Sequence, residues 1–274
     1  MSDRRYHHFL PKDHLNEDIF LVSFPKSGNT WFRFLVANAL KFHYQVDREV
    51  NFFSIHDIIP DIYISKNISP SGPFGIQSLP RFIKSHDPYN PFYYRAVVLV
   101  RNPEKVMLSY YAHLRNYNKI PESMTLSEMI AHHKYGIEAW NTHTRSWIDK
   151  TRDGHIIQIF QYEKLLENTT EQLSRFFDLV GLKLSQETLQ QAIGASSKRS
   201  MQASDARHFS TQLLKQRTSG FVRGTKGNTL SAEDILYIRR ITEEVCQELD
   251  MYSPNTGHSK SASFEYSVAQ SSGE

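Results

Sequence analysis

The polar turn Pro25–Thr30, which reads PKSGNT, has the residue types of an anion-binding loop. It follows the apolar run Ile19–Phe24 and precedes Thr30–Phe42, which has helical periodicity. The free N–H groups and positive dipole end at the start of a helix favour a bound anion. Lys26 adds a mobile positive charge, and Gly28 lets the backbone approach a ligand closely. Short hydrogen-bonding side chains are supplied by Ser27, Asn29 and Thr30.

The spacing of this turn differs from the nucleotide-binding loop of kinases, G-x-x-x-x-G-K-[ST]. Lys26 precedes the only glycine, Gly28, and Ser23 stands where the first glycine of that loop would fall. An alternative is a polar turn that only caps a helix, with Thr30 as the N-cap. A phosphate site is favoured because several polar or small residues converge at one point.

Two more groups with useful chemistry directly follow apolar runs. Arg101 follows Arg95–Val100, and its planar guanidinium suits a phosphate monoester. His86 follows Arg81–Ser85, and a histidine with a pKa of ~6.5 can accept a hydroxyl proton near neutral pH. Taken alone, Arg101 could form only a surface ion pair, and His86 is one of 13 histidines.

The elements that must position these groups alternate between strands and helices. Near-continuous apolar strands alternating with helices are typical of a parallel sheet covered on both faces, with ligands bound beyond the C-terminal strand ends. The sequence therefore predicts an α/β fold with a central parallel sheet. The expected strands are Ile19–Phe24, Arg81–Ser85, Arg95–Val100 and His155–Phe160, and the expected helices are Thr30–Phe42, Glu104–Asn116, Leu126–Lys134, Ile137–Thr151, Glu163–Val180, Ser185–Ile193 and Ser231–Leu249.

Between the first helix and the second strand lies a long insertion, 41–80, interrupted by four prolines. Insertions beside the C-terminal edge of a sheet commonly form substrate walls. We expect an N-terminal extension at 1–18, one domain at 19–252 and a disordered tail at 253–274, because the tail is rich in Ser and Gly and lacks apolar periodicity.

Composition sets limits on the class of protein. The chain has 274 residues, of which 39% are hydrophobic and 22% charged, and its net charge of +3 indicates no nucleic-acid partner. The single cysteine, Cys246, excludes an intrachain disulfide and favours a reducing compartment. No apolar run approaches ~20 residues, and no signal-peptide pattern precedes Ile19, so we expect a cytoplasmic protein without a membrane span.

The stretch FPKSGNTW resembles the 5′-phosphosulfate loop of the cytosolic-type sulfotransferases, [TY]-Y-P-K-[SA]-G-T-T-W. Asn29 replaces a threonine and keeps a hydrogen-bonding side chain. The matching positions are Pro25, Lys26, Ser27, Gly28, Thr30 and Trp31.

Two further stretches resemble motifs of the same family. RAVVLVRNPEKVMLSYYAH has the arginine and serine of the 3′-phosphate motif at the same offset, Arg101 and Ser109, followed by an aromatic pair. RFIKSHDP resembles I-K-T-H-L-P, whose histidine is the general base, so the resemblance implies that role for His86. Lys84 is then a supporting positive charge near the reacting sulfuryl group.

The remaining matches are looser. SGFVRGTKGNTLS resembles the loop R-K-G-x-x-G-D-W, with Arg223 and Gly224 as the implied 3′-phosphate contacts, although Val222 occupies the arginine position. Trp31 matches the tryptophan that stacks on adenine. Tyr162 in QYEKLLEN and Ser196 in SSKRSM match adenine-binding positions, and core packing is the alternative for the aromatic residues.

The resemblance implies a single sulfotransferase domain with P-loop-NTPase-like topology and a strand-loop-helix that binds 3′-phosphoadenosine 5′-phosphosulfate (PAPS). It implies in-line transfer of a sulfuryl group to a small-molecule, glycan or lipid alcohol, without a metal. His86 is the implied base, and Lys26 stabilises the leaving phosphate. The alternatives are a P-loop-type nucleotide kinase and a non-catalytic nucleotide-binding relative. The oligomeric state cannot be read from the sequence.

Overall fold

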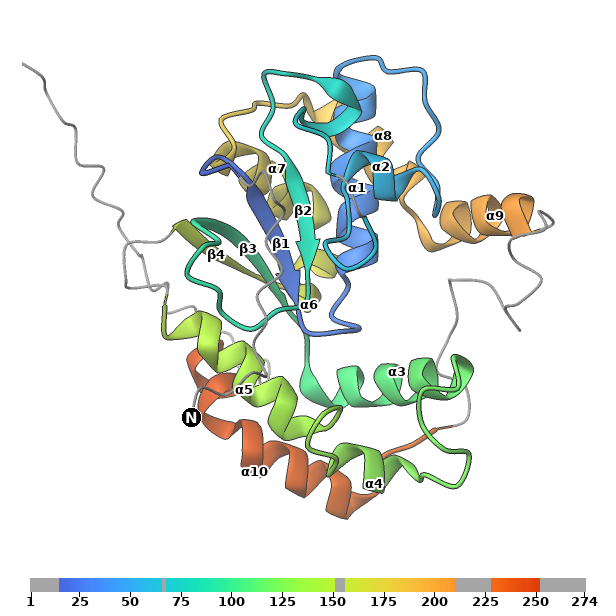
Figure 1. The fold of residues 1–274 in the computed structure, drawn as a ribbon, viewed down its shortest axis with the longest axis vertical. Helices are drawn as coiled ribbons and strands as arrows, with labels where there is room; N and C mark the ends of the chain where they lie inside the picture. Colours follow the sequence, from blue (N-terminus) through green and yellow to red (C-terminus); the bar gives the residue numbers. More distant parts are fainter. Residues whose placement is uncertain (1–14, 66–67, 151–155, 210–227, 252–274) are drawn as a thin grey trace, which may run out of the picture.

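The computed structural model describes residues 15–65, 68–150, 156–209 and 228–251. Its centre is one sheet of four parallel strands in the order β2-β1-β3-β4 (Figure 1). The strands are β1 (Ile19–Ser23), β2 (Phe82–Ser85), β3 (Arg95–Val100) and β4 (Ile156–Gln161). The predicted parallel α/β sheet is confirmed, and each predicted strand lies within one residue of its observed bounds.

Both faces of the sheet are buried, which explains why the strands are apolar without interruption. In β1, Ile19 and Leu21 belong to one core, and Phe20 and Val22 belong to another on the opposite face. The first core is covered by three helices, α1 (Asn29–His43), α7 (Thr169–Leu179) and α8 (Gln186–Ala195) (Figure 1). The second core, on the opposite face, is covered by four helices, α3 (Pro103–Asn116), α4 (Leu126–Ile130), α5 (Ile137–Ile148) and α10 (Ala232–Glu248).

Several helical predictions differ from the structure. The segment Glu163–Val180 is not one helix but two, α6 (Tyr162–Glu167) and α7, because Asn168 leaves helical geometry and caps α7 with its side chain. The α4 helix ends at Ile130 rather than Lys134. An unpredicted helix, α9 (Lys198–Phe209), follows α8; its sequence KRSMQASDARHF carries little apolar periodicity.

The insertion runs along the outer edge of β2. It contains the short helices α2 (Ile55–Ile58) and η1 (Pro73–Gly75), and Asp61 pairs with Lys84 in an isolated parallel bridge. Buried Arg33 of α1 donates to the carbonyl oxygens of Ile55 and Ile59 and so holds the C-terminal end of α2. The insertion therefore covers the edge of the sheet. No helix within the described ranges is long and apolar enough to cross a membrane.

A buried ion pair fixes the start of the domain to β2. Arg81 donates to both carboxylate oxygens of Asp18 at 2.7 and 2.5 Å, and both side chains are at most 3% exposed. The matching of a guanidinium fork with a carboxylate makes this a bidentate pair.

We expect Asp18→Ala to lower the free energy of unfolding by about 3–5 kcal/mol, because it leaves a buried guanidinium without its carboxylate. Urea unfolding measures the change. The control is Asp57→Ala, which removes the exposed Arg48–Asp57 pair and should cost about 0–1 kcal/mol. Equal losses in the two variants would contradict this account.

Candidate active site

The turn after β1 leaves the start of α1 open. Gly28 is the N-cap with φ +96°, no side chain caps the helix, and the first helical hydrogen bond runs from Phe32 N–H to Gly28 C=O at 3.0 Å. The preceding amide groups therefore lack helical partners. The alternative with Thr30 as N-cap is wrong, since Thr30 lies inside the helix. Lys26 adopts φ +71°, a conformation that costs a residue with a side chain about 1–3 kcal/mol.

Tyr162 at the start of α6 packs directly over this turn. A Cβ atom at Gly28 would lie 2.3 Å from Cδ2 of Tyr162, so no residue but glycine fits without displacing the ring. Trp31 meets the same ring edge to face at 5.7 Å, and the guanidinium of Arg101 lies 4.6 Å from its centroid. Three predicted site residues from two separate segments, Gly28 and Trp31 at the start of α1 and Arg101 at the end of β3, thus surround Tyr162.

Several polar atoms at the turn are buried without a partner among the described residues. They are Ser27 Oγ, Asn29 Oδ1 and Arg101 Nε. The Lys26 ammonium also has no carboxylate partner within the described part of the chain. Burial lowers the pKa of Lys26, and the nearby charge of Arg101 lowers it further. Of these atoms Ser27 Oγ and Arg101 Nε can donate a hydrogen bond, whereas Asn29 Oδ1 can only accept one. The two orphaned donors, the open helix start and the uncompensated positive charge fit a bound anion.

Asn29 has a structural task that explains its presence in the turn. Its Nδ2 donates to Leu21 C=O at 2.9 Å and to Ser23 Oγ at 3.3 Å. The side chain therefore fastens the first residue of α1 to the end of β1.

His86 lies beside the same turn, because β2 and β1 are neighbours. Its Nδ1 donates to Ser23 C=O at 2.6 Å, which places the proton on Nδ1 and leaves the lone pair on Nε2. Burial and the charge of Lys84 lower the pKa of His86 to about 3. The pKa of His86 therefore lies well below the value of ~6.5 of an unperturbed histidine, and the imidazole is neutral at physiological pH.

Lys84 forms an ion pair with a carboxylate of the insertion. Its Nζ lies 2.5 Å from Asp61 Oδ2, and both side chains are largely buried. Burial lowers the pKa of Lys84, while Asp61 opposes that shift. The structure thus places the Lys84 ammonium on Asp61 of the insertion, a partner that the sequence did not indicate.

The other predicted residues are supported to different degrees. Arg101 Nη1 donates to Lys26 C=O at 3.0 Å. Arg101, which follows β3, therefore fixes the backbone of the turn Pro25–Thr30, called the lysine turn below. The carbonyl oxygen of Ser196 accepts a hydrogen bond from Trp31 Nε1 at 3.1 Å, and its hydroxyl accepts one from Asn38 Nδ2 at 3.0 Å. Ser196 therefore fixes the position of the tryptophan. The hydroxyl group of Ser109, on α3, makes no hydrogen bond with the described residues. Arg223 and Gly224 lie outside the described residues.

His113 was missed from the sequence. Burial lowers its pKa to about 4, and the charges of Lys26, Lys119 and Lys84 lower it further, so His113 lies within reach of the charges of both lysines of the site. A helix repeats its face every four residues, and His113 follows Ser109 by four, which was the available signal. His143, on α5, is also buried, and its charge would oppose protonation of His86.

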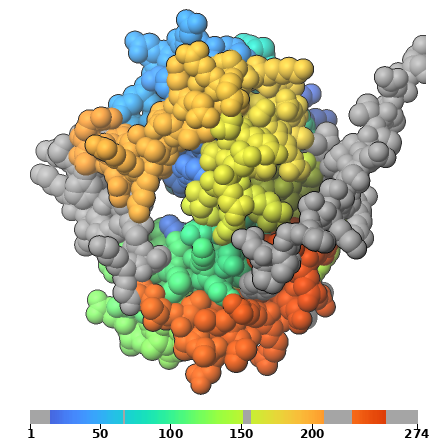
Figure 2. Space-filling model, turned by 180° about the vertical axis from the view of Figure 1, so that it is seen from behind, coloured from blue at the N-terminus to red at the C-terminus, as the bar shows by residue number. Residues whose placement is uncertain are grey.

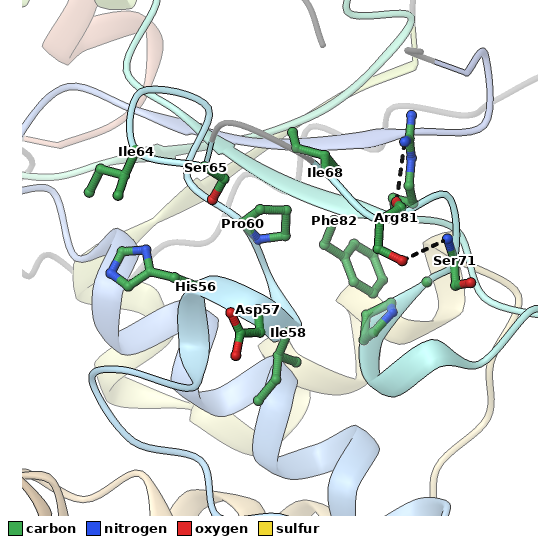
Figure 3. A pocket seen from close by; sticks show the side chains of 13 residues that line it. His56, Asp57, Ile58, Pro60, Ile64, Ser65, Ile68, Ser71, Arg81 and Phe82 are labelled. Carbon is green, nitrogen blue, oxygen red and sulfur yellow. Dashed lines mark hydrogen bonds between the residues drawn. The ribbon is translucent and has the colours of Figure 1, made fainter. Parts of the chain in front are cut away.

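The surface is hollowed on the side where these groups gather. Figure 2 shows a depression between α9 and α3, with residues near the beginning of the described chain at its base. A separate cavity of about 400 Å³ lies among α2, η1 and the start of β2 (Figure 3). Phe82 lines that cavity, and it is four residues, roughly 13 Å, from His86 along the strand. The cavity is therefore distinct from the lysine turn.

Three histidines with lowered pKa values make the acid stability of the protein testable. Burial lowers the pKa of His86 to about 3 and those of His113 and His143 to about 4. Between pH 6.5 and about 4 the unfolded chain binds protons that the folded protein does not. Stability should therefore fall as the pH falls, by up to about 1.4 kcal/mol per pH unit for each fully buried histidine.

Urea unfolding at pH 7 and pH 5 measures this loss. His143→Gln should reduce the difference between the two pH values by about 1–2 kcal/mol. Equal stability of the unmodified protein at the two pH values would contradict the assigned shifts.

Known proteins resemble this chain over most of its length. The sequence is 23% identical over 222 residues to Sulfotransferase 1E1 of Bos taurus, covering 76% of this chain and 74% of that protein. It is 26% identical over 234 residues to Sulfotransferase 2A1 of Rattus norvegicus, covering 80% and 78%.

Solved structures share the fold. Retinol dehydratase in a complex with retinol and PAP superposes with a TM-score of 0.67 at 17% identity, over 88% of this chain and 84% of that one. Mouse sulfotransferase SULT7A1 complexed with PAP gives 0.55 at 18% identity, over 87% and 86%. The family model described as the sulfotransferase domain matches residues 16–252. The chain therefore belongs to the sulfotransferase domain family and is an enzyme of that class.

Proposed function

We propose that this enzyme transfers a sulfuryl group from PAPS to the hydroxyl group of an acceptor alcohol. The observation that carries the proposal is the juxtaposition of Lys26, at an uncapped helix start, with His86, whose Nε2 is left with its lone pair. One group can neutralise a leaving phosphate and the other can take a proton, and a single hydrogen bond to Ser23 joins their two strand ends.

The donor would be held from both ends. The 5′-phosphosulfate would lie at the start of α1, against Lys26, Ser27, Gly28, Asn29 and Thr30. The orphaned Ser27 hydroxyl and the uncompensated lysine support this placement. The 3′-phosphate would be bound by Arg101, Ser109, Arg223 and Gly224, and the adenine by Trp31, Tyr162 and Ser196.

The reaction forms one S–O bond and breaks another. The acceptor oxygen bonds to sulfur, the bond from sulfur to the bridging oxygen breaks, and adenosine 3′,5′-bisphosphate leaves. His86 Nε2 takes the acceptor proton and later releases it to solvent. A bound anion would raise the pKa of His86 from its low value, because a nearby negative charge favours the imidazolium. Lys26 neutralises charge on the bridging oxygen.

Lys84 would act through the field of its charge. The paired carboxylate of Asp61 opposes the lowering of its pKa by burial, and both groups lie near His86. The positive charge beside the sulfuryl group would come from Lys26, Lys84 and the start of α1, so the proposed reaction uses no metal.

The acceptor is proposed to be a small-molecule, glycan or lipid alcohol with an apolar portion. Five aromatic side chains are at least 36% exposed, two in the insertion (Phe53 and Tyr63) and three outside it (Phe92, Tyr94 and Tyr117). The structural neighbours named above include complexes with retinol and, in a second retinol dehydratase structure, androsterone. The buried free thiol of Cys246 agrees with the proposed cytoplasmic location.

A screen with labelled donor tests the function. The purified chain is incubated with PAPS carrying ³⁵S and with panels of apolar alcohols, sugars and lipids, with and without EDTA. Sulfated product identified by mass supports the proposal, and turnover that survives EDTA supports the metal-free chemistry. Tight binding of adenosine 3′,5′-bisphosphate without any sulfated product would instead favour a non-catalytic relative.

Three single variants should separate chemistry from donor binding. His86→Ala should lower kcat by about 10²–10⁴-fold, and Lys26→Ala by about 10²–10³-fold. Arg101→Ala should mainly weaken binding of adenosine 3′,5′-bisphosphate, measured by calorimetry. Lys164→Ala, at an exposed position on α6, is the control. Near-full turnover of His86→Ala at neutral pH would show that another group is the base.

A further inference from the structure

The carboxylate next to His86 binds two tyrosine hydroxyls. Asp87 Oδ1 accepts from Tyr63 OH, and Asp87 Oδ2 accepts from Tyr93 OH at 2.6 Å. The backbone N–H of Asp87 donates to Ser85 Oγ at 3.0 Å. Each carboxylate oxygen thus has its own phenol partner, which fixes the orientation of the side chain.

One of these tyrosines also contacts His86. The His86 backbone N–H donates to Tyr63 OH at 3.2 Å, and the two rings are nearly parallel, with centroids 6.3 Å apart. The Tyr63 hydroxyl therefore joins the backbone of His86 to the carboxylate of Asp87. Tyr63 comes from the insertion, so the insertion reaches the residue proposed as the base.

The other tyrosine anchors the carboxylate in the core. Tyr93 is fully buried and stacks on Phe20 of β1, with ring centroids 3.6 Å apart. Trp147 Nε1 donates to Asp87 C=O at 3.1 Å. Residue 87 is held through its side chain and its backbone by parts of the core that belong to β1 and α5.

Burial and the charge of Asp87 raise the pKa of both Tyr63 and Tyr93. Both phenols therefore remain protonated donors throughout the neutral range. In the motif I-K-T-H-L-P the position after the histidine is leucine, which accepts no hydrogen bond, so this arrangement depends on the aspartate of this chain.

We propose that Asp87, with Tyr63 and Tyr93, is a positioning residue that orients His86 for proton transfer. This rests on the proposed role of His86 as the base. The hydrogen bond to Ser23 sets which nitrogen carries the proton, and the tyrosine–aspartate cluster sets where the backbone holds the ring.

Kinetics on Asp87→Asn and Tyr63→Phe provide the first test. Both should lower kcat by about 10–100-fold, because a displaced base loses alignment with the acceptor. The KM for PAPS and the affinity for adenosine 3′,5′-bisphosphate should stay within twofold. The matched controls are Asp178→Asn, an exposed carboxylate on α7, and Tyr237→Phe on α10, and both should leave kcat unchanged.

The second test needs no activity. In ¹⁵N-histidine-labelled protein, the His86 signals are assigned by their loss in His86→Ala. The unmodified protein should show a proton on Nδ1 and no titration between pH 5 and 8. Asp87→Asn and Tyr63→Phe should show mixed tautomers or a titration within that range.

A kcat within twofold of the unmodified enzyme, together with unchanged His86 signals, would overturn the proposal. So would a loss of kcat accompanied by an equal loss of nucleotide affinity, which would make Asp87 merely structural. If the unmodified protein transferred no sulfuryl group to any acceptor, the proposed function would fail, while the histidine signals would still decide whether Asp87 orients His86.

Discussion

The hydrogen bond from His86 Nδ1 to the carbonyl of Ser23 joins the ends of two neighbouring strands. It fixes the tautomer of the imidazole and its distance from the lysine turn, which begins two residues after Ser23. A parallel sheet makes this contact possible, because β1 and β2 end at the same edge. The rest of the structure keeps that edge rigid: two apolar cores hold the strands from both faces, and Asn29 ties α1 to β1.

The site concentrates positive charge where little else offsets it. Arg101 lies close enough to Lys26 for its charge to lower the pKa of the lysine, and Lys26 occupies a left-handed backbone conformation. Open amides at the start of α1 add to this potential. Such an arrangement is unfavourable in the protein alone and becomes favourable when an anion binds. The backbone strain at Lys26 and the repulsion between Lys26 and Arg101 therefore fit a binding site for a negatively charged ligand.

Much of the sheet could be predicted from the sequence, and so could the positions of several residues of the proposed site at the strand ends, because both depend on local patterns. Apolar runs predicted the strands. Lys26, His86 and Arg101 were identified as candidates because each follows such a run. The partners of those residues could not be predicted. Asp61 reaches Lys84 from a proline-rich insertion without periodicity, and the low pKa of His86 depends on burial by distant segments. The helix α9 and the break at Asn168 were also missed, because apolar periodicity marks neither.

The pairing of the insertion with β2 has a consequence for how this enzyme could change. Lys84 N–H donates to Pro60 C=O at 2.8 Å, and Ile62 N–H donates to Lys84 C=O at 3.1 Å, so the insertion satisfies backbone groups of an edge strand. A bare strand edge invites pairing with other chains. The same segment contributes exposed aromatic residues to the proposed acceptor wall. Exchanging it to obtain a new acceptor preference would therefore also uncover a strand edge, and variants with altered specificity would tend to aggregate unless the Pro60–Ile62 stretch is kept.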